Sequence, residues 1–210
     1  EIVLAERIAP YKLSDFESIS HVRNHLIESF FNYKVEQNMG KIINVDDKTV
    51  IHESNIGKLS SGALGGKGRG ISFINSLIYN FNINKYVPGI KIKMPKTFII
   101  GTDEYDHFIG RNDLLNRAGQ ESDFTKISRM FLDTELSSEL ILRLEKVLKL
   151  LTKPIADRSS GLFEDSLMQP FAGIFSTYLL PNNHNEVEQR LKDLCNAVKM
   201  VFASIFAETS

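Results

Sequence analysis

Residues 62–81 read GALGGKGRGISFINSLIYNF, and this stretch holds the densest glycine cluster of the chain. Apolar residues follow the cluster at helical spacing from Ile71 to Phe81, which predicts a helix that starts at the glycines. Backbone N–H groups at such a helix start can approach a phosphate, and Lys67 would add a positive charge. The spacing fits neither GxxxxGK[ST] nor GxGxxG. A flexible turn with incidental glycines therefore stays open as an alternative.

Residues 154–160 read PIADRSS and supply a second candidate, Arg158. The pattern predicts a strand over 155–159, a loop rich in glycine, serine and acids over 159–170, and another strand over 171–180. A guanidinium at the end of a strand is well placed to bind a phosphate through two hydrogen bonds. The alternative is a surface ion pair between Arg158 and Asp157, Glu164 or Asp165.

Several other segments carry patterns of their own. An apolar stripe from Phe16 to Tyr33 predicts a helix with Ser14 or Asp15 as its N-cap, and residues 38–55 are expected to connect it to the glycine cluster. A strand is expected over 94–101, followed by a helix from a capping Thr102 to Ile109. Further helices are expected over 124–131, 136–151 and 187–205, with 111–134 otherwise weakly patterned. Irregular alternation of helices and strands favours an α+β fold.

Composition excludes several classes. The 210 residues include 25 basic and 26 acidic side chains, which disfavours a nucleic-acid-binding protein, and no apolar run is long enough for a membrane span. The single cysteine, Cys195, excludes an internal disulfide framework, favours a cytoplasmic location and is expected in the core. His21 and His25 share a helix face but lack the carboxylates of a metal site, so no metal ligand is expected here. Both ends look cut, which suggests a piece of a longer protein.

Four blocks in order resemble one family. They are GGKGRGI (65–71), MPKTFIIGT (94–102), PIADRSS (154–160) and FAG (171–173). This series is similar to the nucleotide-binding region of phosphoenolpyruvate synthase and pyruvate phosphate dikinase. The resemblance covers about residues 56–181, and residues 1–50 carry no motif of that family.

The resemblance implies the first half of an ATP-grasp domain over 51–210, preceded by an N-terminal helical extension and polar linker over 1–50. Lys67 and Arg158 match family residues that contact ATP phosphates, and the loop after Arg158 would be a mobile lid. ATP and Mg²⁺ are the implied cofactors. The other positions implied to lie at the nucleotide are Gly65, Gly66, Gly68, Ser159, Gly173 and Thr177.

The chain also departs from the family. Asp157 replaces the usual valine beside the arginine, although strand alternation could point it away from ATP. Pro170 replaces a common serine. No segment matches the family's acidic magnesium ligands, its phosphohistidine domain or its pyruvate-binding barrel, so these are expected outside this chain.

The expected function of the full-length protein is that of an ATP-dependent phosphotransferase. In the family's scheme ATP phosphorylates a histidine, which passes the phosphoryl group to pyruvate. A glucan or another small molecule is an alternative acceptor. A non-catalytic ATP-grasp relic that senses nucleotide or docks a partner is the alternative from another class. These 210 residues alone are expected to be inactive.

Overall fold

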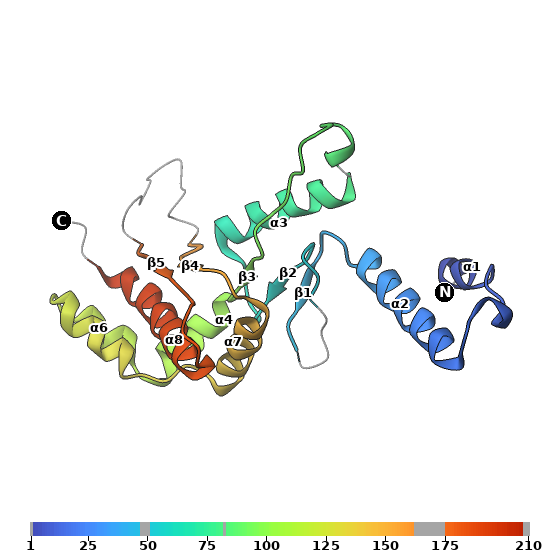
Figure 1. Ribbon diagram of the computed structural model, residues 1–210. Coiled ribbons are helices and arrows are strands. Elements are labelled where there is room, and N and C mark those ends of the chain that lie inside the picture. The colour runs from blue at the N-terminus through green and yellow to red at the C-terminus, as the bar shows by residue number, and fades with distance from the viewer. Residues whose placement is uncertain (1, 47–50, 82, 162–174, 208–210) are drawn as a thin grey trace.

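The computed structural model describes residues 2–46, 51–81, 83–161 and 175–207 (Figure 1). Its α-helices and strands are, in chain order, α1 (Ile2–Ile8), α2 (Ile19–Gln37), β1 (Ile42–Asn44), β2 (Ile56–Lys58), α3 (Gly65–Asn80), β3 (Phe98–Ile99), α4 (Thr102–Arg111), α5 (Leu114–Gly119), α6 (Phe124–Leu132), α7 (Ser138–Leu150), β4 (Ile155–Arg158), β5 (Thr177–Leu180) and α8 (Val187–Ala203). Short 3-10 turns occur at Leu13–Asp15, Ile83–Lys85 and Ser204–Phe206.

The strands form two separate small sheets. In the first, β1, β2 and β3 lie in that order and are parallel, so α3 is the crossover between two neighbouring parallel strands. In the second, β4 and β5 pair antiparallel in a register that places Ile155 opposite Leu180. This mixture of helices with parallel and antiparallel strands confirms the α+β class.

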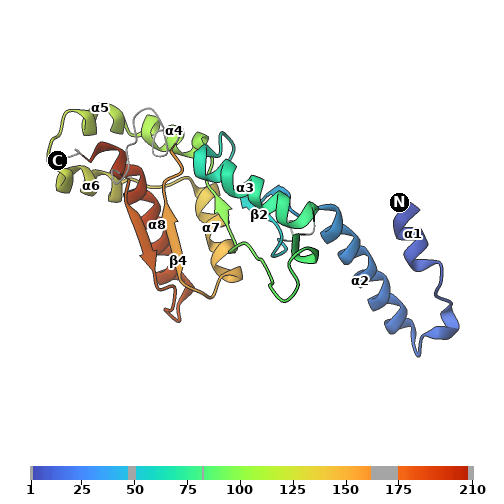
Figure 2. The same ribbon diagram turned by 90° about the horizontal axis from the view of Figure 1, so that it is seen from above.

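The core lies where the helices of the second half of the chain meet. α8 packs against α6, α7 and both strands of the β4–β5 sheet, and these elements lie together in both views (Figures 1 and 2). The apolar stripe of α7 faces this core, where Leu140 and Leu148 are each only 1% exposed. The largest fully buried side chains also include Phe108, Leu114, Ile127 and Phe131. The helices expected over 124–131 and 136–151 are confirmed, each within two residues at either end.

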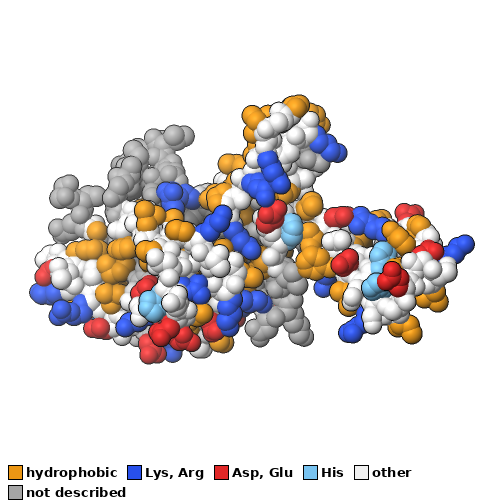
Figure 3. Space-filling view, in the orientation of Figure 1, with side chains coloured by type: hydrophobic (Ala, Val, Ile, Leu, Met, Phe, Trp, Pro, Cys, Tyr) orange, Lys and Arg blue, Asp and Glu red, His pale blue; other side chains and the backbone are white. Residues whose placement is uncertain are grey.

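The first two helices form an arm that extends away from the core (Figures 1 and 2). Neither α1 nor α2 has a buried residue, and hydrophobic side chains lie at the surface of the arm (Figure 3). Both amino groups of the Arg7 guanidinium donate to the Glu36 carboxylate, and one of these bonds measures 2.9 Å. The arm is therefore held together mainly by contacts between its own two helices.

The expected N-cap of α2 was wrong. Ser18, not Ser14 or Asp15, is the cap, and its Oγ accepts from the N–H of His21 at 3.2 Å. Asp15 is used one turn earlier, where its carboxylate accepts from the N–H of Lys12 at 2.8 Å in the 3-10 turn. The N-cap therefore lies three or four residues later than expected, because a local side-chain bond to the backbone at Asp15 forms a separate 3-10 turn before α2.

The segments around the first sheet also differ from expectation. β1 lies inside the expected connecting segment over 38–55, and β3 occupies only Phe98–Ile99 of the expected strand over 94–101. α5 was not expected at all. Thr102 does not cap α4, because Gly101 is the N-cap, and the Thr102 hydroxyl instead accepts from the N–H of Ala63 at 3.0 Å. Contacts between distant segments decided these details.

Candidate functional site

The β4–β5 sheet has one covered face and one exposed face. Burial alternates along both strands, and α8 packs on the side of the more buried residues. Arg158 and Thr177 are direct partners across the two strands, and both belong to the exposed set. The pairing thus brings together two of the expected nucleotide-binding residues, which are 19 positions apart in the sequence.

Asp157 belongs to the opposite face of β4. Its residue is half-buried, and its Oδ2 is enclosed with no hydrogen-bond partner among the described residues. Burial raises the pKa of this carboxyl group from its ordinary 3.8 to about 6. Within the described part of the chain Asp157 forms no ion pair with Arg158, so the carboxylate does not neutralise the neighbouring guanidinium. Glu164 and Asp165, the other candidate partners of Arg158, lie outside the described residues.

The start of α3 is joined to the end of β4. The helix begins at Gly65 inside the glycine cluster, as the sequence predicted. The N–H of Gly66 donates to the backbone oxygen of Ser160 at 2.9 Å, and the N–H of Gly68 donates to the Oγ of Ser160 at 2.8 Å. These two amides, which the sequence analysis expected to face a phosphate, are therefore bonded to Ser160 in this structure.

Lys67 lies between those two amides in the first turn of α3 and is half-buried. Arg158 lies two residues before Ser160. The hydrogen bonds of Ser160 therefore bring the segment that carries Lys67 next to the segment that carries Arg158. Ser159, whose Oγ accepts from the N–H of Gly161 at 3.0 Å, lies at the same junction.

Close packing at this junction requires glycine. Gly65 has a φ of +72°, and a Cβ built on it would lie 1.7 Å from the backbone oxygen of Ser160. A Cβ on Gly68 would lie 3.1 Å from the Leu64 side chain. In contrast, a Cβ on Gly70 would meet nothing within 4 Å. Glycine at position 65 thus has a structural reason of its own, whereas at position 68 a side chain would only require its neighbours to shift by a few tenths of an ångström.

The histidines and the cysteine considered in the sequence analysis show no arrangement that would bind a phosphate or a metal ion among the described residues. His25 packs against the rings of Tyr11 and Phe16, with ring centroids 4.3 and 5.2 Å away. Burial raises the pKa of the Cys195 thiol, which fits a core residue rather than a nucleophile. The described residues contain no group of three or more His, Cys, Asp or Glu side chains that could hold a metal ion. Gly173 lies outside the described residues.

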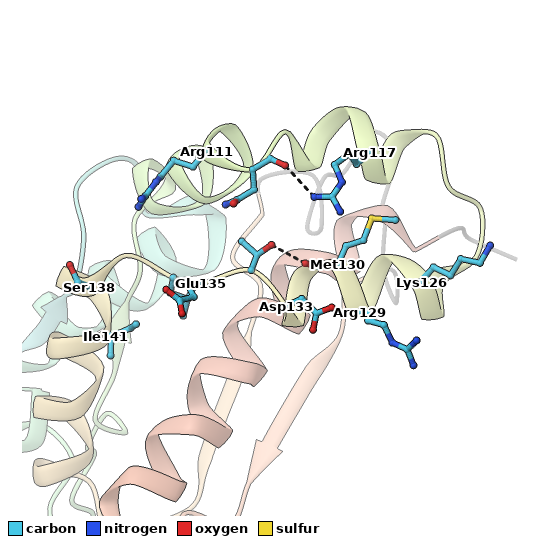
Figure 4. A pocket seen from close by; sticks show the side chains of 12 residues that line it. Arg111, Arg117, Lys126, Arg129, Met130, Asp133, Glu135, Ser138 and Ile141 are labelled. Carbon is cyan, nitrogen blue, oxygen red and sulfur yellow. Dashed lines mark hydrogen bonds between the residues drawn. The ribbon is translucent and has the colours of Figure 1, made fainter.

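A different part of the molecule holds a polar cavity of about 870 Å³ (Figure 4). It lies among α4, α5, α6 and α7, and none of the expected nucleotide-binding residues lines it. Three arginines from three helices line it together with two acids, Asp133 and Glu135; the arginines are Arg111, Arg117 and Arg129. Sequence reasoning missed this cavity because its lining comes mainly from the weakly patterned stretch 111–134.

Residues 61–210 match the family described as pyruvate phosphate dikinase, AMP/ATP-binding domain. The class of this protein is therefore that of the nucleotide-binding domains of dikinases. The match extends over most of the chain, and the chain belongs to this family, which confirms the resemblance seen in its four sequence blocks. No curated protein and no solved structure matches the chain. No helix in the described residues combines the length and apolar character needed to cross a bilayer.

Proposed function

We propose that this chain binds the polyphosphate of ATP beside the exposed face of the β4–β5 sheet, as the first half of an ATP-grasp domain. The observation that carries the proposal is the junction at Ser160, where the segments of Lys67 and Arg158 are hydrogen-bonded together. Two cations from distant segments that meet at one junction suit a ligand with several negative charges. The family match over 61–210 supports the nucleotide as that ligand.

Each residue would act through its own chemistry. Arg158 would bind phosphate oxygens through a fork of N–H donors, and Lys67 would act as a compact charge. Thr177, the neighbour of Arg158 across the sheet, would donate its hydroxyl. Gly65, Gly66 and Gly68 would act through the junction, since the amides of Gly66 and Gly68 bond to Ser160 and hold the Lys67 helix start there, and Ser159 would contribute at the strand end. By the family resemblance Gly173 belongs to the same set.

The magnesium ion that the family implies finds no ligand cluster among the described residues. We place its ligands outside this chain and derive no step through the ion. The described residues bind and orient the phosphates and stabilise negative charge on them.

For the full-length protein we propose a dikinase-type phosphotransferase, in which ATP phosphorylates a histidine that then phosphorylates pyruvate. A different acceptor, such as a glucan or another small molecule, would use the same ATP-binding part. A carboxylate beside Arg158 would favour the non-catalytic relic over a functional ATP site. The placement of Asp157 on the covered face weakens that reason.

The test is calorimetric titration of the chain with Mg-ATP at low salt, where screening of exposed charges is weakest. Lys67→Ala and Arg158→Ala should each weaken binding by about tenfold or more, because each removes a charge-assisted contact. Lys192→Ala on α8 and Arg23→Ala on α2 are the matched controls, since both side chains are exposed and lie on other elements. Binding that survives in both site variants would contradict the proposal. We also expect no steady ATP hydrolysis by these 210 residues alone.

A further inference from the structure

Ser160 makes three hydrogen bonds to a segment more than ninety positions earlier in the chain. Its backbone oxygen accepts from the N–H of Gly66 at 2.9 Å. Its Oγ accepts from the N–H of Gly68 at 2.8 Å and donates to the backbone oxygen of Leu64, also at 2.8 Å. The side chain and the backbone carbonyl of Ser160 thus bind the residue before α3 and the first turn of α3.

One of these bonds, from the N–H of Gly66, satisfies a group that a helix start leaves unpaired, and the Ser160 hydroxyl bridges the carbonyl of Leu64 and the N–H of Gly68, which lies four residues later. The first N–H groups of an α-helix have no acceptor within the helix, and a polar side chain just before the helix normally supplies one. Here the N-cap position is Leu64, whose side chain cannot accept a hydrogen bond. Ser160 therefore does for α3 what a local cap does elsewhere, but from the other side of the proposed site.

The start of α3 is shaped to fit against Ser160. Gly65 adopts a positive φ, and any side chain there would collide with the backbone oxygen of Ser160. The residues on both sides of Lys67 are those that donate to Ser160, and Arg158 precedes Ser160 by two residues. The position of one cation relative to the other is thus set largely through Ser160.

We propose that Ser160 is a positioning residue, which holds the Lys67 helix start against the Arg158 strand end so that both cations meet the same polyphosphate. The inference rests on the proposed function. If the two segments were not joined, a triphosphate would have to order them on binding, and the lost conformational entropy would weaken its affinity. When Ser160 joins the segments, this cost is avoided because they are already arranged. Ser160 needs no contact with the nucleotide for this role.

The experiment compares Mg-ATP and AMP binding by the wild-type chain and by Ser160→Ala, with calorimetry at low salt. We expect Ser160→Ala to weaken Mg-ATP binding by about tenfold and AMP binding by less than about twofold, because AMP has no outer phosphates for two cations to share. Ser204→Ala is the control. It also removes a buried serine hydroxyl, bonded to the backbone oxygen of Val201 at 2.7 Å, at the far end of α8.

A second measurement separates the loss of the hydrogen bonds at the junction from the loss of nucleotide affinity. NMR amide exchange in the nucleotide-free chain should become faster at Gly68, whose side-chain acceptor is removed in Ser160→Ala, but not in Ser204→Ala. Should Ser160→Ala fail to fold, Ser160→Cys fills nearly the same space with a weak hydrogen-bonding group, and the same loss of Mg-ATP affinity is expected.

Three results would overturn the inference: unchanged Mg-ATP affinity with faster exchange at Gly68, equal losses of affinity for ATP and AMP, or tighter Mg-ATP binding. The last would mean that Ser160 competes with the phosphates for the same amides. If Lys67→Ala and Arg158→Ala weaken binding and Ser160→Ala does not, only this inference fails. If the wild-type chain binds no Mg-ATP, the proposed function itself fails.

Discussion

The N-terminal arm and the core use helices with similar sequence patterns but very different surroundings. α2 carries the apolar stripe from Ile19 to Tyr33, yet Ile19 is 88% exposed and no residue of the helix is buried. α7 carries a comparable stripe, and Leu140, Leu144, Val147 and Leu148 are all buried. Apolar spacing therefore predicts a helix in both places, but burial depends on whether another element lies against the stripe.

The largest expected difference between the two regions comes from removing an aromatic ring. Phe131 is fully buried in the core, so Phe131→Ala should lower the free energy of unfolding by about 3–5 kcal/mol. Phe30 on α2 is 54% exposed, so Phe30→Ala should change it by less than about 0.5 kcal/mol. Urea denaturation of both variants measures the two changes in the free energy of unfolding. Equal losses would show that the arm is packed as tightly as the core.

The second prediction concerns pH and the covered face of β4. The pKa of Asp157 is about 6 in the folded chain and 3.8 ordinarily, so the folded state holds its proton more tightly. Stability should therefore fall as pH rises from about 4 to above 6, by up to about 3 kcal/mol for this group. Asp157→Asn should remove this fall and be the more stable protein at pH 7. Unfolding curves at pH 4, 5, 6 and 7 measure it, and parallel pH profiles for both proteins would contradict it.

The third prediction compares the N-caps of the two regions. Ser137 caps α7 by accepting from the N–H of Leu140 at 3.1 Å, and its hydroxyl donates to the buried Glu104 at 2.8 Å. Ser137→Ala should therefore cost about 1–2 kcal/mol of global stability. Ser18→Ala on α2 should instead reduce local helicity, visible in amide exchange, with little change in global unfolding. The reverse order of effects would show that the arm and the core unfold as one unit.

The smallest expected effect lies at the exposed ion pair of the arm. Arg7→Gln removes the charge that pairs with Glu36, and both side chains are well exposed. We expect no measurable shift in global unfolding, because exposed pairs are screened by water and salt. Amide exchange in α1 should nevertheless become faster, since this pair joins α1 to α2. If amide exchange in α1 is unchanged in Arg7→Gln, the aromatic contacts of the arm alone hold its two helices together.

Local patterns allowed a large part of the fold to be predicted. The helix from the glycine cluster, the helices at 124–132, 138–150 and 187–203, and the strand at 155–158 were all expected near their observed positions. The short strands β1 and β2 were not, because three residues are too few to show a period. These strands are stabilised by hydrogen bonds to neighbours that the local sequence does not reveal.

The residues of the candidate site likewise fall into those that the sequence could indicate and those that only the structure reveals. Lys67 and Arg158 could be singled out from the sequence because a glycine cluster and an arginine at a strand end are local signals. Ser160 could not, because its role consists of bonds to Leu64, Gly66 and Gly68 across the fold. A serine in a polar loop carries no signal of such a partner.

By itself the sequence determined where most helices begin and end and which family the chain belongs to, and it singled out two cations as candidates for phosphate binding. These follow from side chains close together along the chain and from the order of the four blocks. Only the tertiary structure decided that Asp157 faces the covered side of the sheet, that Arg158 and Thr177 are neighbours, and that Ser160 caps a distant helix. The physical reason is that burial and long-range hydrogen bonds depend on which segments meet, and local periodicity does not specify the partner.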